Sequence, residues 1–282
     1  LRLKHLNKNK YKCVNCGEGC SALYKTYGPS VLKLTKCTKC KGVVDKYIEY
    51  DPVIVVIDLI LVSKEAQRHI IYNTEFKSYW KLFLILIILE TYGLWQNDSL
   101  FNIAINTMCG IKSNDTNSTH LVLPMDIQVP ESWKSHCQGW APQHRGDNSD
   151  LFLWEKDFYV QFLSTFAGVV IAPIGNTRNV TRNSCAMRCR PVGVRRALRA
   201  LPLAHAGVLL ALAVPVWGSA RADADVVPYS LIFAYNFVMF LSVFTVLYEC
   251  PTFVTTPVLV ASNCAKYLTT YLATPYLRTY VN

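Results

Sequence analysis

The sequence predicts a small cysteine-rich head followed by a mainly α-helical, multi-pass membrane body. Two Cys-x-x-Cys pairs lie within the first 40 of the 282 residues. Apolar residues make up 51% of the chain and are bunched into runs, of which 200–220 and 227–248 reach the roughly 20 residues needed to cross a bilayer. Basic residues gather beside such runs, as expected of cytoplasmic parts: residues 1–50 hold eleven Lys or Arg and three acids, and residues 175–199 hold seven Arg and no acid.

The predicted head covers residues 13–52 and follows a basic lead-in, residues 1–12. Because the chain starts with Leu rather than Met, we expect its true N-terminus to lie upstream. Each Cys-x-x-Cys turn can bring two thiolates to one metal ion, and the twenty residues between the pairs fit a four-cysteine zinc site. We therefore predict a zinc-ribbon-like head with a structural zinc, bound by Cys13, Cys16, Cys37 and Cys40.

Two other interpretations of these cysteines compete with that prediction. Cys20 is close enough to act as a ligand, but two pairs already complete a tetrahedron. The four cysteines could also be unrelated buried or redox-active thiols. The odd count of eleven cysteines and the absence of an apolar core at the start of the chain argue against a secreted disulfide scaffold.

The segments around the second cysteine pair predict a strand and a helix. Residues 30–35 alternate apolar and polar side chains, as a short strand does. Asp51 as N-cap and Pro52 at the first helical position predict the start of a helix over 53–76. Its apolar stretch is too short to span a bilayer and is interrupted by Asp58, so we expect an interfacial or partner-packed helix.

The remaining chain predicts alternating membrane and polar segments. Residues 77–95 predict a transmembrane helix, although at 1.5 Å per residue the 17 residues from Tyr79 reach only about 25 Å. Residues 96–150 predict a polar lumenal loop, because they hold three N-glycosylation acceptors, Asn97, Asn114 and Asn117. The membrane body continues over 151–282, with spans expected at 158–174, 200–220 and 227–248, a fifth span or re-entrant piece at 251–265, and an Arg-rich cytosolic loop at 175–199.

Two motifs carry a family resemblance: KCTKCKGVVDKYIEYDP at 36–52 and RHIIYNT at 68–74. They resemble the homology domain of the Arv family, endoplasmic-reticulum proteins required for normal sterol distribution. The resemblance covers about residues 11–95 and departs at 175–226, where the Ala- and Arg-rich composition fits either an insertion or an error in the gene model. It implies a cytosol-facing zinc-binding head on a multi-pass body, with roles in sterol trafficking, sphingolipid homeostasis and the supply of glycosylphosphatidylinositol intermediates.

Together with the apolar runs, the resemblance implies lipid transport and lipid homeostasis in the endoplasmic reticulum membrane. We expect membrane lipids (sterols and glycolipid intermediates) as ligands, a protein partner at the zinc head, no nucleic acid and no catalysis. The residues expected to join head and body are Tyr47, Glu49, Tyr50, Asp51 and Pro52.

Two other function classes remain open. A membrane-embedded lipid-modifying enzyme, or its accessory subunit, would need ionisable residues at membrane depth, and the candidates lie scattered near segment ends: Asp58, His69, Glu90, Asp157 and Glu249. A zinc-ribbon nucleic-acid-binding module is permitted by the basic head and its tyrosines, but the two long apolar runs argue against it.

Overall fold

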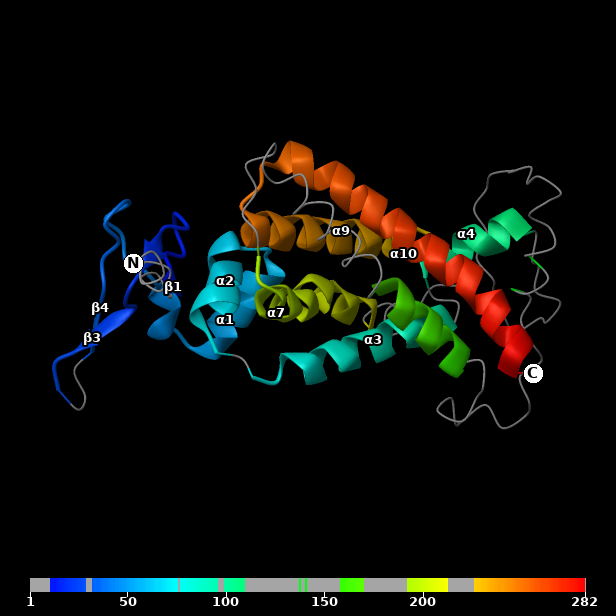
Figure 1. The fold of residues 1–282 in the computed structure, drawn as a ribbon, viewed down its shortest axis with the longest axis horizontal. Helices are drawn as coiled ribbons and strands as arrows, with labels where there is room; N and C mark the ends of the chain where they lie inside the picture. The colour runs from blue at the N-terminus through cyan, green and yellow to red at the C-terminus, as the bar shows by residue number, and fades with distance from the viewer. Residues whose placement is uncertain are drawn as a thin grey trace, which may run out of the picture.

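A computed structural model describes residues 11–28, 32–75, 77–95, 99–109, 137, 140, 158–169, 192–212 and 226–281. These parts form an elongated molecule, with the cysteine-rich head at one end and a body of helices along its long axis (Figure 1). The end of the chain lies at the far end of the body from the head (Figure 1). The order of a small head followed by a mainly helical body agrees with the sequence prediction.

The head consists of two separate two-stranded antiparallel sheets. Strand β1 (Tyr11–Lys12) pairs with β2 (Gly19–Cys20), and β3 (Tyr24–Thr26) pairs with β4 (Leu32–Leu34). Strand β4 lies within the segment predicted as a strand. In the described part of the head, Cys13, Leu23, Cys37 and Val44 form one small buried cluster, and Val14 and Tyr47 pack in a second cluster with Val55 and Ala66. These are too few side chains to stabilise a domain without a further constraint.

The segment predicted as one helix over 53–76 is divided into three. A short 3-10 helix η1 (Lys46–Ile48) precedes α1 (Pro52–Ile60), which is followed by α2 (Lys64–Arg68) and the π-helix η2 (His69–Asn73). The predicted helix start is confirmed, because Asp51 Oδ1 accepts the N–H of Val53 at 3.2 Å. The division follows from the backbone of Val62, which takes the left-handed conformation with φ 59°.

The end of α1 is a Schellman motif built on that residue. The N–H of Ser63 donates to Asp58 O at 2.9 Å and the N–H of Val62 donates to Leu59 O at 3.0 Å. Glycine normally occupies this left-handed position, and a β-branched residue there is rare. The sequence therefore contains no signal for the break.

The body contains seven helical pieces in the described residues: α3 (Tyr79–Trp95), α4 (Leu100–Cys109), a helix at Phe158–Val169, α7 (Val194–His205), the 3-10 helix η4 (Ala206–Leu212), α9 (Val227–Tyr248) and α10 (Thr252–Val281). Helix α3 leads away from the head, α9 returns toward it, and α10 runs back to the far end (Figure 1). The main core joins α7, the second half of α9 and Ile71 of η2.

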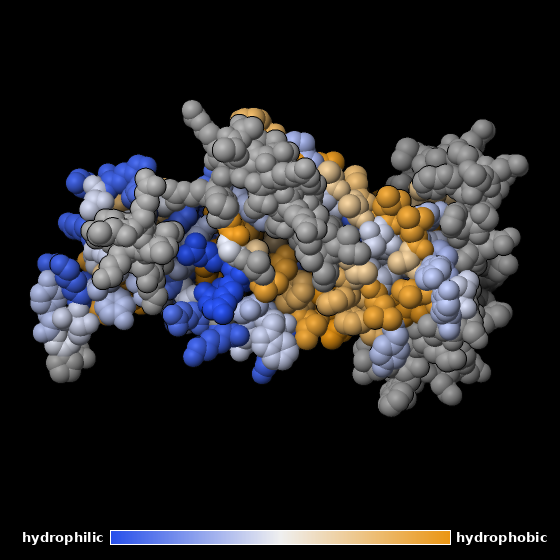
Figure 2. Space-filling view, in the orientation of Figure 1, coloured by the Kyte–Doolittle hydropathy of each residue, from blue (hydrophilic) through white to orange (hydrophobic). Residues whose placement is uncertain are grey.

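One described helix, α9, is long and apolar enough to cross a membrane, which by itself is weak evidence for a span. Only 33% of the apolar 18-residue stretch of this helix is buried, so much of its apolar surface faces outward. Figure 2 shows apolar side chains over the helical body. The described part of 200–220 is not one continuous helix, since α7 ends at His205 and η4 follows. Of the segment 251–265, all residues after Pro251 lie within the 30-residue α10. The multi-pass arrangement stays a prediction.

The predicted polar segments contain more structure than their composition indicates. Helix α4 lies within the predicted loop 96–150, and Cys109 at its end forms a disulfide with Cys137. The acceptors Asn97, Asn114 and Asn117, and Asp157, lie outside the described residues. Of the Arg-rich segment 175–199, the described part from Val194 onward is helical and belongs to α7.

Candidate metal centre

Both Cys-x-x-Cys pairs form the same tight turn. The carbonyl of Cys13 accepts the N–H of Gly17 at 2.9 Å, and the carbonyl of Cys37 accepts the N–H of Lys41 at 3.1 Å. Gly17 and Lys41 have φ of 76° and 61°, so each turn closes with a residue in the left-handed conformation. The N–H of Val14 donates to Val44 O at 2.9 Å, which links the two turns. The local sequence therefore places all four thiols on one side of the head.

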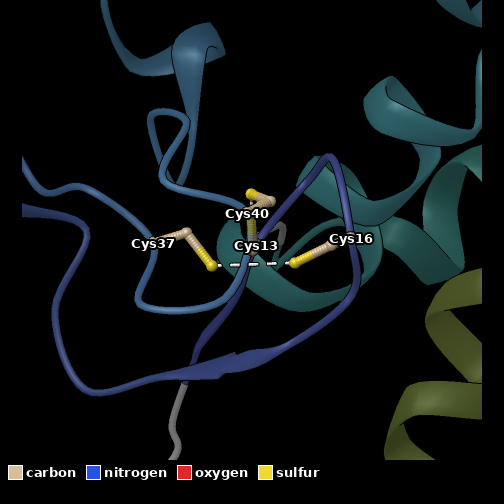
Figure 3. Close-up of side chains that lie close together, drawn as sticks. All are labelled: Cys13, Cys16, Cys37 and Cys40. Atoms are coloured by element: carbon tan, nitrogen blue, oxygen red, sulfur yellow. Dashed lines mark hydrogen bonds between the residues drawn. The ribbon is translucent and has the colours of Figure 1, made fainter.

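The four sulfur atoms lie close together and point toward a common centre (Figure 3). The Sγ atoms of Cys13 and Cys40 are 3.7 Å apart, those of Cys16 and Cys37 are 3.6 Å apart, and all four lie within 4.8 Å of one another. A tetrahedral ion with metal–sulfur bonds of about 2.3 Å places its sulfur ligands roughly 3.8 Å apart. The four cysteines therefore fit a tetrahedral metal ion.

The thiols of the head differ in acidity. Burial raises the pKa of Cys13 to about 12, whereas the backbone N–H groups of Cys40 and Lys39 lower the pKa of Cys37 to about 6. Cys37 is therefore the more acidic of these two thiols, and binding of a cation by the cluster requires Cys13 to release its proton. Burial also raises the pKa of Cys20, outside the cluster, to about 11, which keeps it protonated.

A buried aspartate joins the head to the helices that follow. Asp45 is fully buried, and its Oδ1 accepts the N–H of Tyr47 at 3.0 Å. Its Oδ2 lies 2.7 Å from His69 Nδ1 and accepts a hydrogen bond of 2.7 Å from Asn73 Nδ2. A buried carboxylate is costly unless hydrogen bonds satisfy its oxygens, and two residues of η2 supply them here.

Arg68, at the end of α2, contacts the first cysteine turn directly. Its Nη1 donates to Val14 O at 2.6 Å and to Asn15 O at 2.9 Å. Both carbonyls lie between Cys13 and Cys16 in the chain. The guanidinium therefore fixes the backbone that presents two of the four thiols.

The other face of η2 contacts the body. Ile71 is 1% exposed within the main core, and the Tyr72 hydroxyl donates to Leu247 O at 2.9 Å near the end of α9. Lys12 of β1 forms an ion pair with Glu249, just beyond α9. One short π-helix therefore contacts the cysteine-rich head on one side and the helical body on the other.

The family model of Arv1-like proteins matches residues 12–272, which include the cysteine cluster, η2 and most of the helical body. The chain belongs to the Arv1-like family. The matched range extends beyond the 11–95 of the sequence resemblance and spans residues 175–226, whose composition departs from it.

Several curated relatives share part of this Arv1-like chain. It is 43% identical over 86 residues to Protein ARV1 of Homo sapiens, 37% over 92 residues to Protein ARV 2 of Arabidopsis thaliana, and 30% over 112 residues to Protein ARV1 of Candida albicans. Each alignment covers 30% of this chain and 32%, 40% and 38% of the respective relative. The chain thus spans about a third of the length of the curated relatives it matches. No solved structure matches the protein.

The residues predicted to join the Arv1-like head to the body have different surroundings. Tyr47 is buried, and its hydroxyl donates to Asp58 Oδ2 at 2.7 Å, which ties η1 to α1. Asp51 and Pro52 begin α1. Glu49 and Tyr50 are exposed, although the Tyr50 ring packs edge-on against Tyr47 with centroids 5.7 Å apart.

The sequence reasoning missed the residues that make the tertiary contacts. Asp45 and Arg68 were not singled out, and His69 was considered only as a membrane-depth group. A usable signal was present in RHIIYNT, where polar residues flank three apolar or aromatic ones. This pattern places Arg68, His69 and Asn73 on the head side and Ile71 and Tyr72 on the body side.

Proposed function

We propose that this protein acts in lipid homeostasis of the endoplasmic reticulum membrane, in sterol trafficking, sphingolipid metabolism and the supply of glycosylphosphatidylinositol-anchor intermediates. Membership of the Arv1-like family supports this proposal. The observation that carries it is the direct attachment of the cysteine head, through η2, to a helical body with an outward-facing apolar surface. The proposal assigns the protein no catalytic reaction.

The ion in the head is proposed to be zinc in a structural role. Four thiolates in a tetrahedron are typical of zinc or of an iron–sulfur centre, and Cys-x-x-Cys turns on small strands are typical of zinc ribbons. A site with four protein ligands has no open position for a substrate. Zinc would therefore supply folding energy to the head, whose apolar cluster is small.

The head is proposed to face the cytosol. Its basic composition supports this, and α3 leads from the head to the far end, where Cys109 and Cys137 form a disulfide as in an oxidising lumen (Figure 1). Cys250, next to the ion pair of Glu249 with Lys12, is disulfide-bonded as well. Because disulfides occur near both ends of the body, they do not show which end faces the lumen. The proposed orientation therefore rests on the charge distribution.

The proposed partners are membrane lipids and a protein that contacts the head. Hairpin β3–β4 exposes Tyr24 and Tyr27, and such aromatic side chains are typical of protein contact surfaces. Neither strand of this hairpin packs against the helical body (Figure 1). The hairpin is therefore the part of the head we propose for a protein partner, and nucleic acid is not proposed as a ligand.

A chain of hydrogen bonds resembles catalytic machinery without providing a free nucleophile. The Thr74 hydroxyl lies 3.1 Å from His69 Nε2, and His69 Nδ1 lies 2.7 Å from Asp45, in the order of an Asp–His–hydroxyl triad. The same hydroxyl donates to the backbone carbonyl of His69 at 3.2 Å. We therefore propose a structural role for the three residues.

Depletion and rescue in cells test the proposal. Free sterol is imaged in depleted cells that express wild type, Cys37→Ser or Cys20→Ser. We expect depletion to redistribute sterol, and we expect wild type and Cys20→Ser to restore its distribution. Cys37→Ser should fail to do so, because Cys37, unlike Cys20, belongs to the cluster. Unchanged sterol after depletion, or full rescue by Cys37→Ser at equal protein level, would overturn the proposal.

A further inference from the structure

Three charged or titratable side chains from three helices meet inside the apolar body. Glu90 lies on α3, His205 ends α7 and Lys266 lies on α10. Glu90 Oε1 forms an ion pair with Lys266, and His205 Nδ1 lies 3.6 Å from Glu90 Oε2. The side chains of all three are less than a fifth exposed. Such a cluster is costly in an apolar body and marks a functional site by default.

A small cavity opens beside this cluster. Its volume is about 40 Å³, enough for a few water-sized groups but not for a whole lipid. A Cβ at position 207, on η4 next to the cavity residue Val208, would overlap Asn236 Oδ1, so a larger residue there requires the Asn236 side chain to move. The lining combines the charged cluster, two amides and a set of aromatic rings: Glu90, Asn236, Asn263, Lys266, Phe237 and Tyr267.

Two buried oxygen atoms at the cavity accept no hydrogen bond. They are Glu90 Oε2 and Asn236 Oδ1, both of residues that line the cavity. A buried acceptor without a donor costs about 1 to 3 kcal/mol. Since both acceptors border the same space, a single group that donates a hydrogen bond would satisfy at least one of them.

We propose that this cavity binds the neutral hydroxyl head of a membrane lipid alcohol. The carboxylate of Glu90 and the ammonium of Lys266 already neutralise one another, so a cationic head gains no net attraction. A hydroxyl can donate to Asn236 Oδ1 and accept from Lys266. The rings of Phe233, Phe237 and Phe240 then contact the apolar part that the cavity is too small to enclose. The inference rests on the proposed placement of the body in a membrane.

Photo-crosslinking of the full chain in phosphatidylcholine nanodiscs tests the site. The probes are a photoreactive sterol and a photoreactive diacylglycerol, each paired with its O-methyl ether, which lacks the donated proton. We expect one or both alcohols to label peptides near Asn236 or Lys266, and we expect about tenfold less labelling by the ethers. Which alcohol labels more identifies the source of the hydroxyl.

Variants locate the labelling within the protein. Asn236→Leu removes one acceptor, and Gly207→Ala displaces the same amide by overlap. Both should lower labelling to the level of the ethers. The control is Leu268→Ala, which changes an exposed side chain on α10 directly after the cavity residue Tyr267 in the sequence. This variant should be labelled as strongly as wild type. Equal labelling by alcohols and ethers, or by Asn236→Leu and wild type, would overturn the inference, as would no labelling by any probe.

Failure of this inference can be told apart from failure of the proposed function. Suppose that Cys37→Ser fails to restore sterol distribution, but that Asn236→Leu is labelled as strongly as wild type and the ethers label as strongly as the alcohols. The cavity is then not the site, and the proposed function stands. If the alcohols label the cavity but depletion leaves sterol unchanged, the site stands and the sterol role falls. Elution of Asn236→Leu at the wild-type volume excludes misfolding as the cause of lost labelling.

Discussion

Asn73 pairs with both backbone groups of Lys12. Its Nδ2 donates to Lys12 O at 2.8 Å and its Oδ1 accepts the Lys12 N–H at 2.9 Å. One side-chain amide thus bonds to β1 as a neighbouring strand would. Because Lys12 directly precedes Cys13, these two hydrogen bonds link η2 to the segment that leads into the candidate metal centre.

Replacing Asn73 by Asp should loosen the head from the body. The substitution keeps the shape but removes the donor to Lys12 O and brings a second carboxylate close to Asp45 Oδ2, which now receives the amide at 2.7 Å. Loss of hydrogen bonds to a buried carboxylate costs about 1.5 to 3 kcal/mol. Limited proteolysis in detergent micelles should show faster cleavage between the head and α1.

The matched control for this variant is Glu49→Gln. It also changes one charge near the junction, but Glu49 is exposed. We expect its cleavage rate to equal that of wild type. If Asn73→Asp is cleaved no faster than Glu49→Gln, the amide pairing does not hold the head in place.

Removal of the metal should unfold the head while leaving the body helical. Zinc binding to four cysteines contributes on the order of 10 to 16 kcal/mol, and the buried cluster of the head is too small to replace it. Metal analysis should find one zinc per chain in wild type and in Cys20→Ser, and much less in Cys37→Ser. Chelation should increase hydrogen exchange in β1 to β4 but not in α9.

Two other results would contradict this prediction. If Cys20→Ser loses zinc as well, Cys20 belongs to the site, against its place outside the cluster of four. If chelation exposes α9 as fully as the head, the two parts unfold together. The contacts through η2 would then couple the unfolding of the head to that of the body.

Local signals in the sequence predicted the cysteine cluster and the start of α1. The spacing of the cysteine pairs and the Asp51–Pro52 start of α1 depend on neighbouring residues, and both appear in the structure. The break at Val62 could not be predicted, because a β-branched residue takes the backbone that glycine usually supplies. Short-range chemistry therefore accounts for the turns and caps but not for how the helices divide.

The long-range contacts could not be predicted from the sequence. Glu90 was interpreted as one of several ionisable residues near segment ends, yet its partner Lys266 lies 176 residues away. Lys12 and Asn73 are 61 residues apart, and Tyr72 reaches an α9 residue 175 positions later. A single sequence records no pairing at such distances, so both the junction and the cavity required the structure.

Tyr47 should make the head sensitive to high pH. Burial, reinforced by the hydrogen bond to Asp58, raises the pKa of the Tyr47 phenol in the folded protein. The unfolded chain therefore loses this proton first, near pH 10, so stability from this group is complete below pH 10 and falls as the pH rises further. Tyr47→Phe should cost about 1.5 to 3 kcal/mol at pH 7.

The pH dependence of unfolding tests this role of the Tyr47 phenol. Unfolding of wild type and Tyr47→Phe is followed by urea titration from pH 7 to 11. We expect the difference in unfolding free energy to shrink above pH 10, because only wild type carries the penalty of ionising Tyr47. A difference that stays constant up to pH 11 would show that the phenol is not held protonated by the fold.

The exposed face of α1 should lie in the membrane interface. Val55 is the one buried residue of this nine-residue helix, and the apolar side chains of Val53, Val56, Ile57 and Ile60 are at least half exposed. An apolar face of this kind next to basic residues is typical of helices at the headgroup boundary. A fluorescent amino acid at position 57 should be quenched by lipids brominated near the headgroup, whereas the same amino acid at position 27, on the β3–β4 hairpin, should not. Ile57→Ser should weaken the binding of α1 to the membrane by about 1 kcal/mol. Absence of quenching at both positions would place α1 against a protein partner instead.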